Sequence, residues 1–188
     1  MKRREFIRTT SLAAPALSLF PSNLSAIVRD FSVVGKLEKR SLGSTGEMLS
    51  VIGFGGIIVK DATVDDASSI VKFAIDAGVN YFDVAPSYGD AEIKLGPALE
   101  PYRKKVFLSC KTTNRTIEDA HKELTQSLVN LKTDYFDLYQ LHAVTSLDEV
   151  RTILAPGSAL EAIQEAKREG KIRFIGFSAH SVEAALEL

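Results

Sequence analysis

Five strand-like segments alternate with helix-like segments along the chain, and this alternation limits the fold more than any other feature. The expected strands begin about 25 to 36 residues apart, which leaves room for a helical crossover between parallel neighbours. They cover residues 51–56, 79–84, 105–111, 136–142 and 172–178. The spacing therefore predicts an α/β fold in which helices cover a parallel sheet.

The connecting segments carry local signals for helices and for one hairpin. A capping box begins at Thr63 (TVDD) and another at Ser158 (SALE), each ahead of apolar residues at helical spacing. Thr116 precedes a further apolar stripe, and a shorter helix is expected at about 91–99. Residues 37–50 carry two glycines between short apolar stretches, which predicts a small hairpin before the first parallel strand.

Helices on a parallel sheet occur both in doubly wound sheets and in closed barrels, and periodicity alone does not separate the two. The glycine turn at 53–56 lacks the G-x-G-x-x-G spacing, and no acidic residue ends a second strand in the dinucleotide-binding manner. We therefore expect a parallel (β/α) fold of the TIM-barrel type rather than a doubly wound sheet.

The first 30 residues differ from the rest and are expected to form a flexible leader ahead of one domain at 37–188. The segment KRREFIR at 2–8 resembles a twin-arginine export signal, and a weakly apolar stretch follows it. That stretch is too short and too interrupted by proline for a stable membrane span, which needs about 20 apolar residues. The signal predicts an exported, periplasmic protein that uses the twin-arginine machinery. A tail with chance arginines would leave the protein cytoplasmic.

Composition excludes several classes of function. The net charge is −1, with 23 basic and 24 acidic residues, so the chain has no electrostatic footprint for nucleic acid. Cys110 is the single cysteine, which excludes an intrachain disulfide and a thiolate metal cluster, and we expect no metal site. Alternation along its strand places Cys110 on the helix side of the sheet, as a buried and inert thiol.

Four polar side chains stand at the carboxyl ends of three successive expected strands: Asp83 and Tyr88, then Lys111, then His142. In a parallel β/α barrel these ends share one face, where catalytic groups gather. A free phenol has a pKa of about 10, so it needs a nearby cation to act as an acid at neutral pH. Such a set can pass a proton to a carbonyl oxygen. Because no side chain donates hydride, reduction would need a nicotinamide cofactor.

Each of these residues has a simpler explanation when it is taken singly. Asp83 could cap the following turn, Lys111 could be a solvated side chain, and His142 could be a structural histidine. A competing function uses Lys111 as the Schiff-base nucleophile of a lyase, which requires an uncharged amine that Asp83 would oppose. A non-catalytic barrel that binds a cofactor or a partner is the third interpretation. The position of all four residues at one end of consecutive strands favours proton transfer.

Three stretches resemble the aldo/keto reductase family: FDVAPSYG at 82–89, LKTDYFDLYQLH at 131–142 and GKIRFIGFS at 170–178. Their order, spacing and strand context agree with the family from about Leu37 to the last residue. The resemblance implies reversible, nicotinamide-dependent reduction of an aldehyde or ketone to an alcohol, with a small-molecule carbonyl substrate. It also implies NADP(H) more often than NAD(H) as the cofactor.

The same resemblance implies roles for individual residues. Tyr88 would be the general acid/base, Lys111 and Asp83 would tune it, and His142 would help to orient the carbonyl. The residues implied to bind the cofactor are Gly56, Ile57, Asp83 and Ser178, the last through the nicotinamide carboxamide.

Two departures from the family pattern stand out. Ala179 and His180 follow Ser178, whereas many relatives have Asn there, and an alanine side chain cannot hydrogen-bond an amide. The family barrel has eight β/α units and this sequence supplies about five, so we expect a partial barrel. An open sheet exposes unpaired strand edges. We therefore expect a fragment of a longer reading frame, or a truncated product that is inactive alone.

Replacing Arg3 and Arg4 by lysines is expected to stop export of a tagged protein, because the twin-arginine pathway recognises the arginine pair itself. The measurement is the share of the tagged protein in the periplasmic fraction. Arg8→Lys, which lies outside the pair, is the control and should leave export unchanged. Equal periplasmic fractions for the double variant and its parent would contradict the export prediction.

Overall fold

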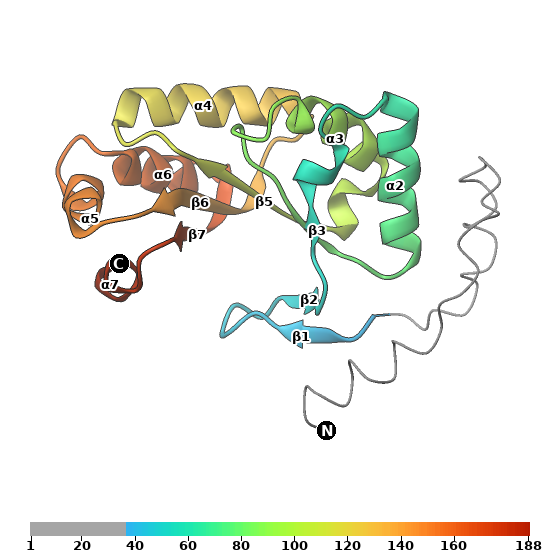
Figure 1. The fold of residues 1–188 in the computed structure, drawn as a ribbon, viewed down its shortest axis with the longest axis horizontal. Helices are drawn as coiled ribbons and strands as arrows, with labels where there is room; N and C mark the ends of the chain where they lie inside the picture. Colours follow the sequence, from blue (N-terminus) through green and yellow to red (C-terminus); the bar gives the residue numbers. More distant parts are fainter. Residues whose placement is uncertain (1–36) are drawn as a thin grey trace, which may run out of the picture. The chain divides into compact units, whose positions relative to one another are not determined.

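The computed structural model describes residues 37–188, so the expected leader at 1–30 lies outside the described residues. Strands and helices alternate through this part of the chain (Figure 1). The strands are β1 (Lys39–Ser41), β2 (Met48–Ser50), β3 (Phe54–Gly55), β4 (Tyr81–Asp83), β5 (Phe107–Thr112), β6 (Phe136–Val144) and β7 (Ile172–Ala179). The α-helices are α2 (Val64–Asp76), α3 (Ala91–Leu99), α4 (Ile117–Asn130), α5 (Leu147–Leu154), α6 (Ala159–Arg168) and α7 (Val182–Glu187). Two short 3-10 helices, η2 (Gly56–Val59) and η3 (Glu100–Lys105), complete the described elements.

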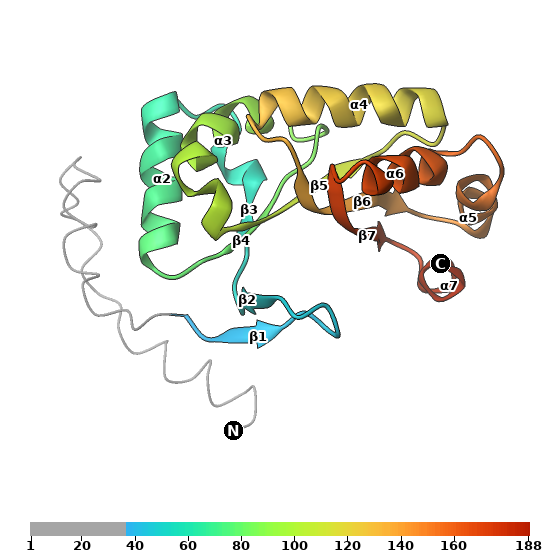
Figure 2. The same ribbon diagram turned by 180° about the vertical axis from the view of Figure 1, so that it is seen from behind.

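Strands β3 to β7 form one parallel sheet in which each strand pairs with the next one along the chain (Figures 1 and 2). A doubly wound sheet would reverse its strand order at a switch point, whereas a barrel keeps neighbours in sequence order. The predicted partial barrel of the TIM type is therefore confirmed. Within the described part, no helix has the length and apolarity needed to cross a bilayer.

The strands pack one set of alternating side chains against the helices. The buried core between the two layers includes Phe82, Leu108 and Tyr139 from the strands and Leu95 and Leu124 from the helices. Cys110 is 0% exposed in this core. Burial raises the pKa of its thiol well above the ordinary value, and the carboxylate of Glu92 adds to this effect. The predicted burial of the thiol is confirmed, and a raised pKa disfavours the reactive thiolate.

The helix starts agree with the sequence in most places. Thr63 and Thr116 each accept a hydrogen bond from the backbone N–H three residues on, at 3.1 and 3.3 Å. Ser158 also precedes a helix, but the predicted capping bond is absent, because its hydroxyl donates to the carbonyl of Ile153 at 2.6 Å instead. Helix α5 was not predicted, although SLDE at 146–149 has the capping pattern and Ser146 forms the cap.

The predicted hairpin is confirmed, and it is bonded to the amino end of the sheet. Strands β1 and β2 are antiparallel. Ser50 donates its backbone N–H to the side chain of Asn80, just before β4, at 2.7 Å. Arg173 of β7 pairs with Glu47 in the hairpin and with the buried Asp137 of β6, the latter at 2.6 Å. These bonds hold the amino ends of the strands and leave the carboxyl ends free for chemistry.

Gly96 sits where helix α3 crosses the end of α4. A Cβ atom there would collide with the carbonyl oxygen of Asn130 and would lie 2.8 Å from the Cα of Leu131. Gly→Ala inside a helix ordinarily stabilises by about 1 kcal/mol. We expect Gly96→Ala to lower the free energy of unfolding by about 1–3 kcal/mol, because backbone must move to admit the methyl group.

The measurement is urea unfolding of the chain followed by far-ultraviolet circular dichroism. Gly55→Ala is the matched control, since no heavy atom lies within 4 Å of a Cβ built there. We expect it to change the free energy of unfolding by less than about 0.5 kcal/mol. A Gly96→Ala protein as stable as its parent would show that the two helices do not approach this closely.

Candidate active site

Lys111 is the centre of a polar cluster at the carboxyl ends of the strands. It is the residue before the last in strand β5, and it is only 4% exposed. The ammonium Nζ donates to the Oδ2 of Asp83 at 2.5 Å, to the carbonyl of Val84 at 3.2 Å and to the hydroxyl of Tyr88 at 3.3 Å. An ammonium group has three N–H donors, and each has an acceptor here. The charge is therefore tolerated at a buried position.

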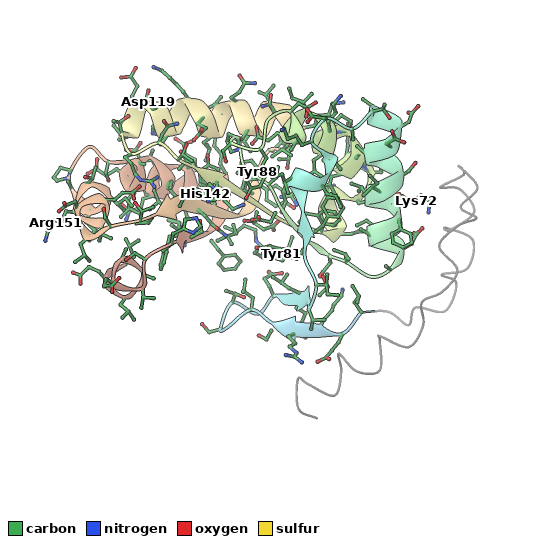
Figure 3. The ribbon with its side chains drawn as sticks, in the orientation of Figure 1. Lys72, Tyr81, Tyr88, Asp119, His142 and Arg151 are labelled. Atoms are coloured by element: carbon green, nitrogen blue, oxygen red, sulfur yellow. The ribbon has the colours of Figure 1, made fainter. Side chains whose placement is uncertain are left out.

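Tyr88 lies in the loop after β4 and folds back over the strand ends. Its backbone N–H donates to the carbonyl of Ala85 at 3.0 Å, and Gly89 follows with a φ of 65°, a conformation that favours glycine. The ammonium of Lys111 stands 5.0 Å from the centre of the phenol ring. The ring of His142 meets the same phenol edge-on, with centroids 6.2 Å apart. Both residues are labelled in Figure 3. The structure thus brings together the four residues that the sequence predicted as catalytic.

The surroundings of His142 favour its neutral form. Partial burial lowers the pKa of its imidazole below 6.5, and the charge of Lys111 lowers it further, whereas Asp83 acts in the opposite direction. A neutral imidazole has one N–H donor and one acceptor nitrogen. Its Nδ1 lies 2.8 Å from the hydroxyl of Ser178 on β7.

The four residues expected to bind the cofactor lie in different surroundings. Asp83 belongs to the Lys111 cluster, and Ser178 joins that cluster through His142. Gly56 is buried at the start of η2, where a Cβ would lie 2.9 Å from the Cβ of Val84. Packing alone therefore requires glycine there. Ile57, the next residue, is 56% exposed.

Sequence reasoning missed two residues that brace the site, Arg115 and Glu149. Arg115 donates to the backbone carbonyl of His142 at 2.6 Å and to the Oε1 of Glu149 at 2.8 Å. Burial raises the pKa of Glu149, but hydrogen bonds from Thr145 and Arg115 outweigh it, so the pKa lies below its ordinary value. The capping pattern at 146–149 was the available signal for Glu149. A contact between a side chain and a distant carbonyl leaves no pattern in the sequence.

The two residues after Ser178 differ in their surroundings. Ala179 ends strand β7 beside Val144 of β6. His180 is exposed and donates its backbone N–H to the carbonyl of Val144 at 2.8 Å. Within residues 37–188, no group of three or more His, Cys, Asp or Glu side chains is arranged to hold a metal ion.

Known proteins match this chain over most of its described length. The profile of the Aldo/keto reductase family matches residues 51–188. The chain is 34% identical over 160 residues to L-galactose dehydrogenase of Arabidopsis thaliana, a match that covers 76% of this chain and 49% of that protein. It is 32% identical over 166 residues to aldo-keto reductase YhdN of Bacillus subtilis. That match covers 78% of this chain and 48% of that protein. The chain spans about half the length of these relatives.

Solved structures resemble it as well. A putative aldo-keto reductase from Pseudomonas aeruginosa superposes with a TM-score of 0.71 and 27% identity, over 82% of this chain and 66% of that one. The holo form of an aldo-keto reductase from Bacillus halodurans gives a TM-score of 0.70 and 29% identity, over 80% of this chain and 53% of that one.

We expect Asp83→Asn to destabilise the chain by roughly 2–4 kcal/mol, because it leaves the buried Lys111 ammonium without its carboxylate. The side chain of Asp83 is 26% exposed, so the loss should be smaller than for a fully buried pair. Urea unfolding measures the change. Asp76→Asn is the matched control, since Asp76 pairs with Lys72 at a similar 2.6 Å but on the open surface. That variant should unfold at the same urea concentration as its parent. Equal effects of the two substitutions would contradict the importance of the buried pair.

Proposed function

The chain belongs to the aldo/keto reductase family, and from this premise we propose that it supplies the catalytic groups of an oxidoreductase that reduces aldehydes or ketones to alcohols. The observation that carries the proposal is the contact between the Lys111 ammonium and the Tyr88 hydroxyl, with His142 beside the same phenol. A small-molecule carbonyl is the proposed substrate, and a nicotinamide cofactor is the proposed source of hydride.

Tyr88 is the proposed general acid. Because Lys111 donates to its oxygen, the phenol's own proton is left to donate to a substrate carbonyl oxygen. As that proton moves, negative charge develops on the phenol oxygen 3.3 Å from an ammonium that Asp83 keeps charged. In the reverse direction the phenolate would accept the alcohol proton. General acid catalysis of this kind contributes about 10²–10⁴-fold to rate.

His142 is proposed to orient the carbonyl. Its low pKa keeps the ring neutral near pH 7, so the ring does not compete with Tyr88 as a charged acid. Its edge-on position against the Tyr88 ring suits two donors that converge on one oxygen atom. Arg115 supports this position by holding the backbone carbonyl of His142.

The bound nicotinamide would supply the hydride, which no side chain can provide. Gly56, Ile57, Asp83 and Ser178 are the residues proposed to hold the cofactor. Ser178 fits an amide group as an acceptor, because its oxygen has two lone pairs and the backbone N–H of Ala143 occupies only one of them. We propose NADP(H) rather than NAD(H), in line with the family resemblance.

The Schiff-base alternative is disfavoured by the surroundings of Lys111. A nucleophilic lysine needs a neutral amine with a free lone pair. Here all three N–H donors have acceptors, and one acceptor is a carboxylate. A binding module without catalysis would have no use for a phenol joined to this ammonium. Borohydride trapping with an aldehyde would label Lys111 only if the lyase alternative were correct.

We expect Tyr88→Phe to lower kcat for an aldehyde panel with NADPH by about 10²–10⁴-fold, because it keeps the ring but removes the acidic proton, together with one acceptor of the Lys111 ammonium. The protein should be assayed with any coding sequence that follows Leu188 included, and as the 188-residue chain. Tyr102→Phe, the same chemical change on the 3-10 helix η3 that precedes β5, is the matched control and should keep full turnover. Unchanged turnover of Tyr88→Phe in an active protein would refute the proposed role.

A further inference from the structure

The hydroxyl of Ser178 joins the ends of strands β6 and β7 through two contacts. It lies 3.0 Å from the backbone nitrogen of Ala143 and 2.8 Å from the Nδ1 of His142. Ala143 has a φ of 58°, a left-handed conformation that is uncommon for a residue other than glycine. The register of the two strands also shifts between Leu141 and Val144. This local bend turns the N–H of Ala143 toward Ser178.

The chemistry of the three groups limits which of them can donate a hydrogen bond and which can accept one. The backbone N–H of Ala143 can only donate, so the oxygen of Ser178 accepts there. A hydroxyl also has one proton to donate. Among residues 37–188, the only acceptor within hydrogen-bond distance of this hydroxyl is the Nδ1 of His142. Donation by Ser178 to Nδ1 would satisfy this proton and make Nδ1 the acceptor nitrogen of the ring.

We propose that Ser178 is a positioning residue that fixes His142 as the tautomer protonated at Nε2. Of the two ring nitrogens, Nε2 is then the one that can donate to a substrate carbonyl. The inference rests on the proposed function of His142 for its catalytic meaning. The tautomer itself is a property of the chain and can be measured without turnover.

This role differs from the carboxamide contact that the family resemblance implies for Ser178, yet the two are compatible. The hydroxyl gives its proton to His142 and one lone pair to Ala143, so a second lone pair stays available. That lone pair could accept an N–H of a carboxamide. Ser178 would then contact both the cofactor and the His142 ring whose tautomer it fixes.

The test is nitrogen-15 NMR of the 188-residue chain with labelled histidine, at pH 8, where a histidine of lowered pKa is neutral. The chain has three histidines, and the variants His121→Gln and His180→Gln complete their assignment. We expect His142 to show a protonated Nε2 and an unprotonated Nδ1. Ser178→Ala should shift this pattern toward a mixture of both tautomers, and Ser178→Thr, which keeps a hydroxyl, should restore it.

His121 is the internal control, because it bonds to Glu165 on helix α6 and its pattern should be the same in the parent chain and in both Ser178 variants. A parent chain with His142 protonated at Nδ1 would overturn the proposal, even if Ser178→Ala failed to fold. An unchanged tautomer in folded Ser178→Ala would overturn it as well. In an active protein, Ser178→Ala should also lower kcat by up to about 10²-fold, and Ser178→Thr should recover most of it.

The two proposals fail in different ways. Full turnover in Tyr88→Phe would refute the reductase mechanism and leave the tautomer result standing. Protonation of His142 at Nδ1 in the parent chain would refute the role of Ser178 and leave the proposed role of Tyr88 as the acid untouched.

Discussion

The buried ammonium of Lys111 is the interaction on which the polar face of this sheet depends. A charge at that depth is stable only when acceptors surround it, because an unpaired buried charge costs several kcal/mol. Strand β4 and the loop after it supply all three acceptors: a carboxylate from Asp83, a backbone carbonyl from Val84 and the phenol oxygen of Tyr88. The same bonds that stabilise the charge therefore fix the position of the Tyr88 phenol, the proposed acid. Stability and chemistry share one set of contacts here, so neither can be changed without the other.

The amino ends and the carboxyl ends of the strands carry different kinds of polar contact. At the amino end, Asp137 joins Arg173 and Arg103, and Arg173 continues to the hairpin, so charged side chains close this end and hold neighbouring strands in register. At the carboxyl end, charged and polar groups point at one another around Tyr88. Division of this kind is general in β/α barrels, where one face serves stability and the other serves catalysis. The part of the chain that matches its relatives holds both ends of these five strands.

The surroundings of two neighbouring groups of the site favour a charged form of one and a neutral form of the other. Lys111 faces a carboxylate and two further oxygens, which suit a cation. His142 faces partial burial and that same cation, which keep it neutral. Pairs of groups whose environments separate their protonation states are typical of acid–base sites. The second layer of contacts, Arg115 on the backbone of His142 and Ser178 on its ring, fixes how the neutral imidazole is presented.

The sequence by itself determined the order of strands and helices, the burial of Cys110 and the common face of Asp83, Tyr88, Lys111 and His142, because side-chain periodicity and strand-end position are local properties. It also placed the helix starts at Thr63 and Thr116, whose caps are bonds between residues three apart. Only the tertiary structure decided that Ser158 bonds to Ile153 rather than capping its helix, that Arg115 reaches His142, and that Ser178 bonds to its ring. Those contacts join residues that are distant in the chain or compete with a local bond. Their existence depends on how β6, β7 and the loops between them pack, which no short sequence pattern records.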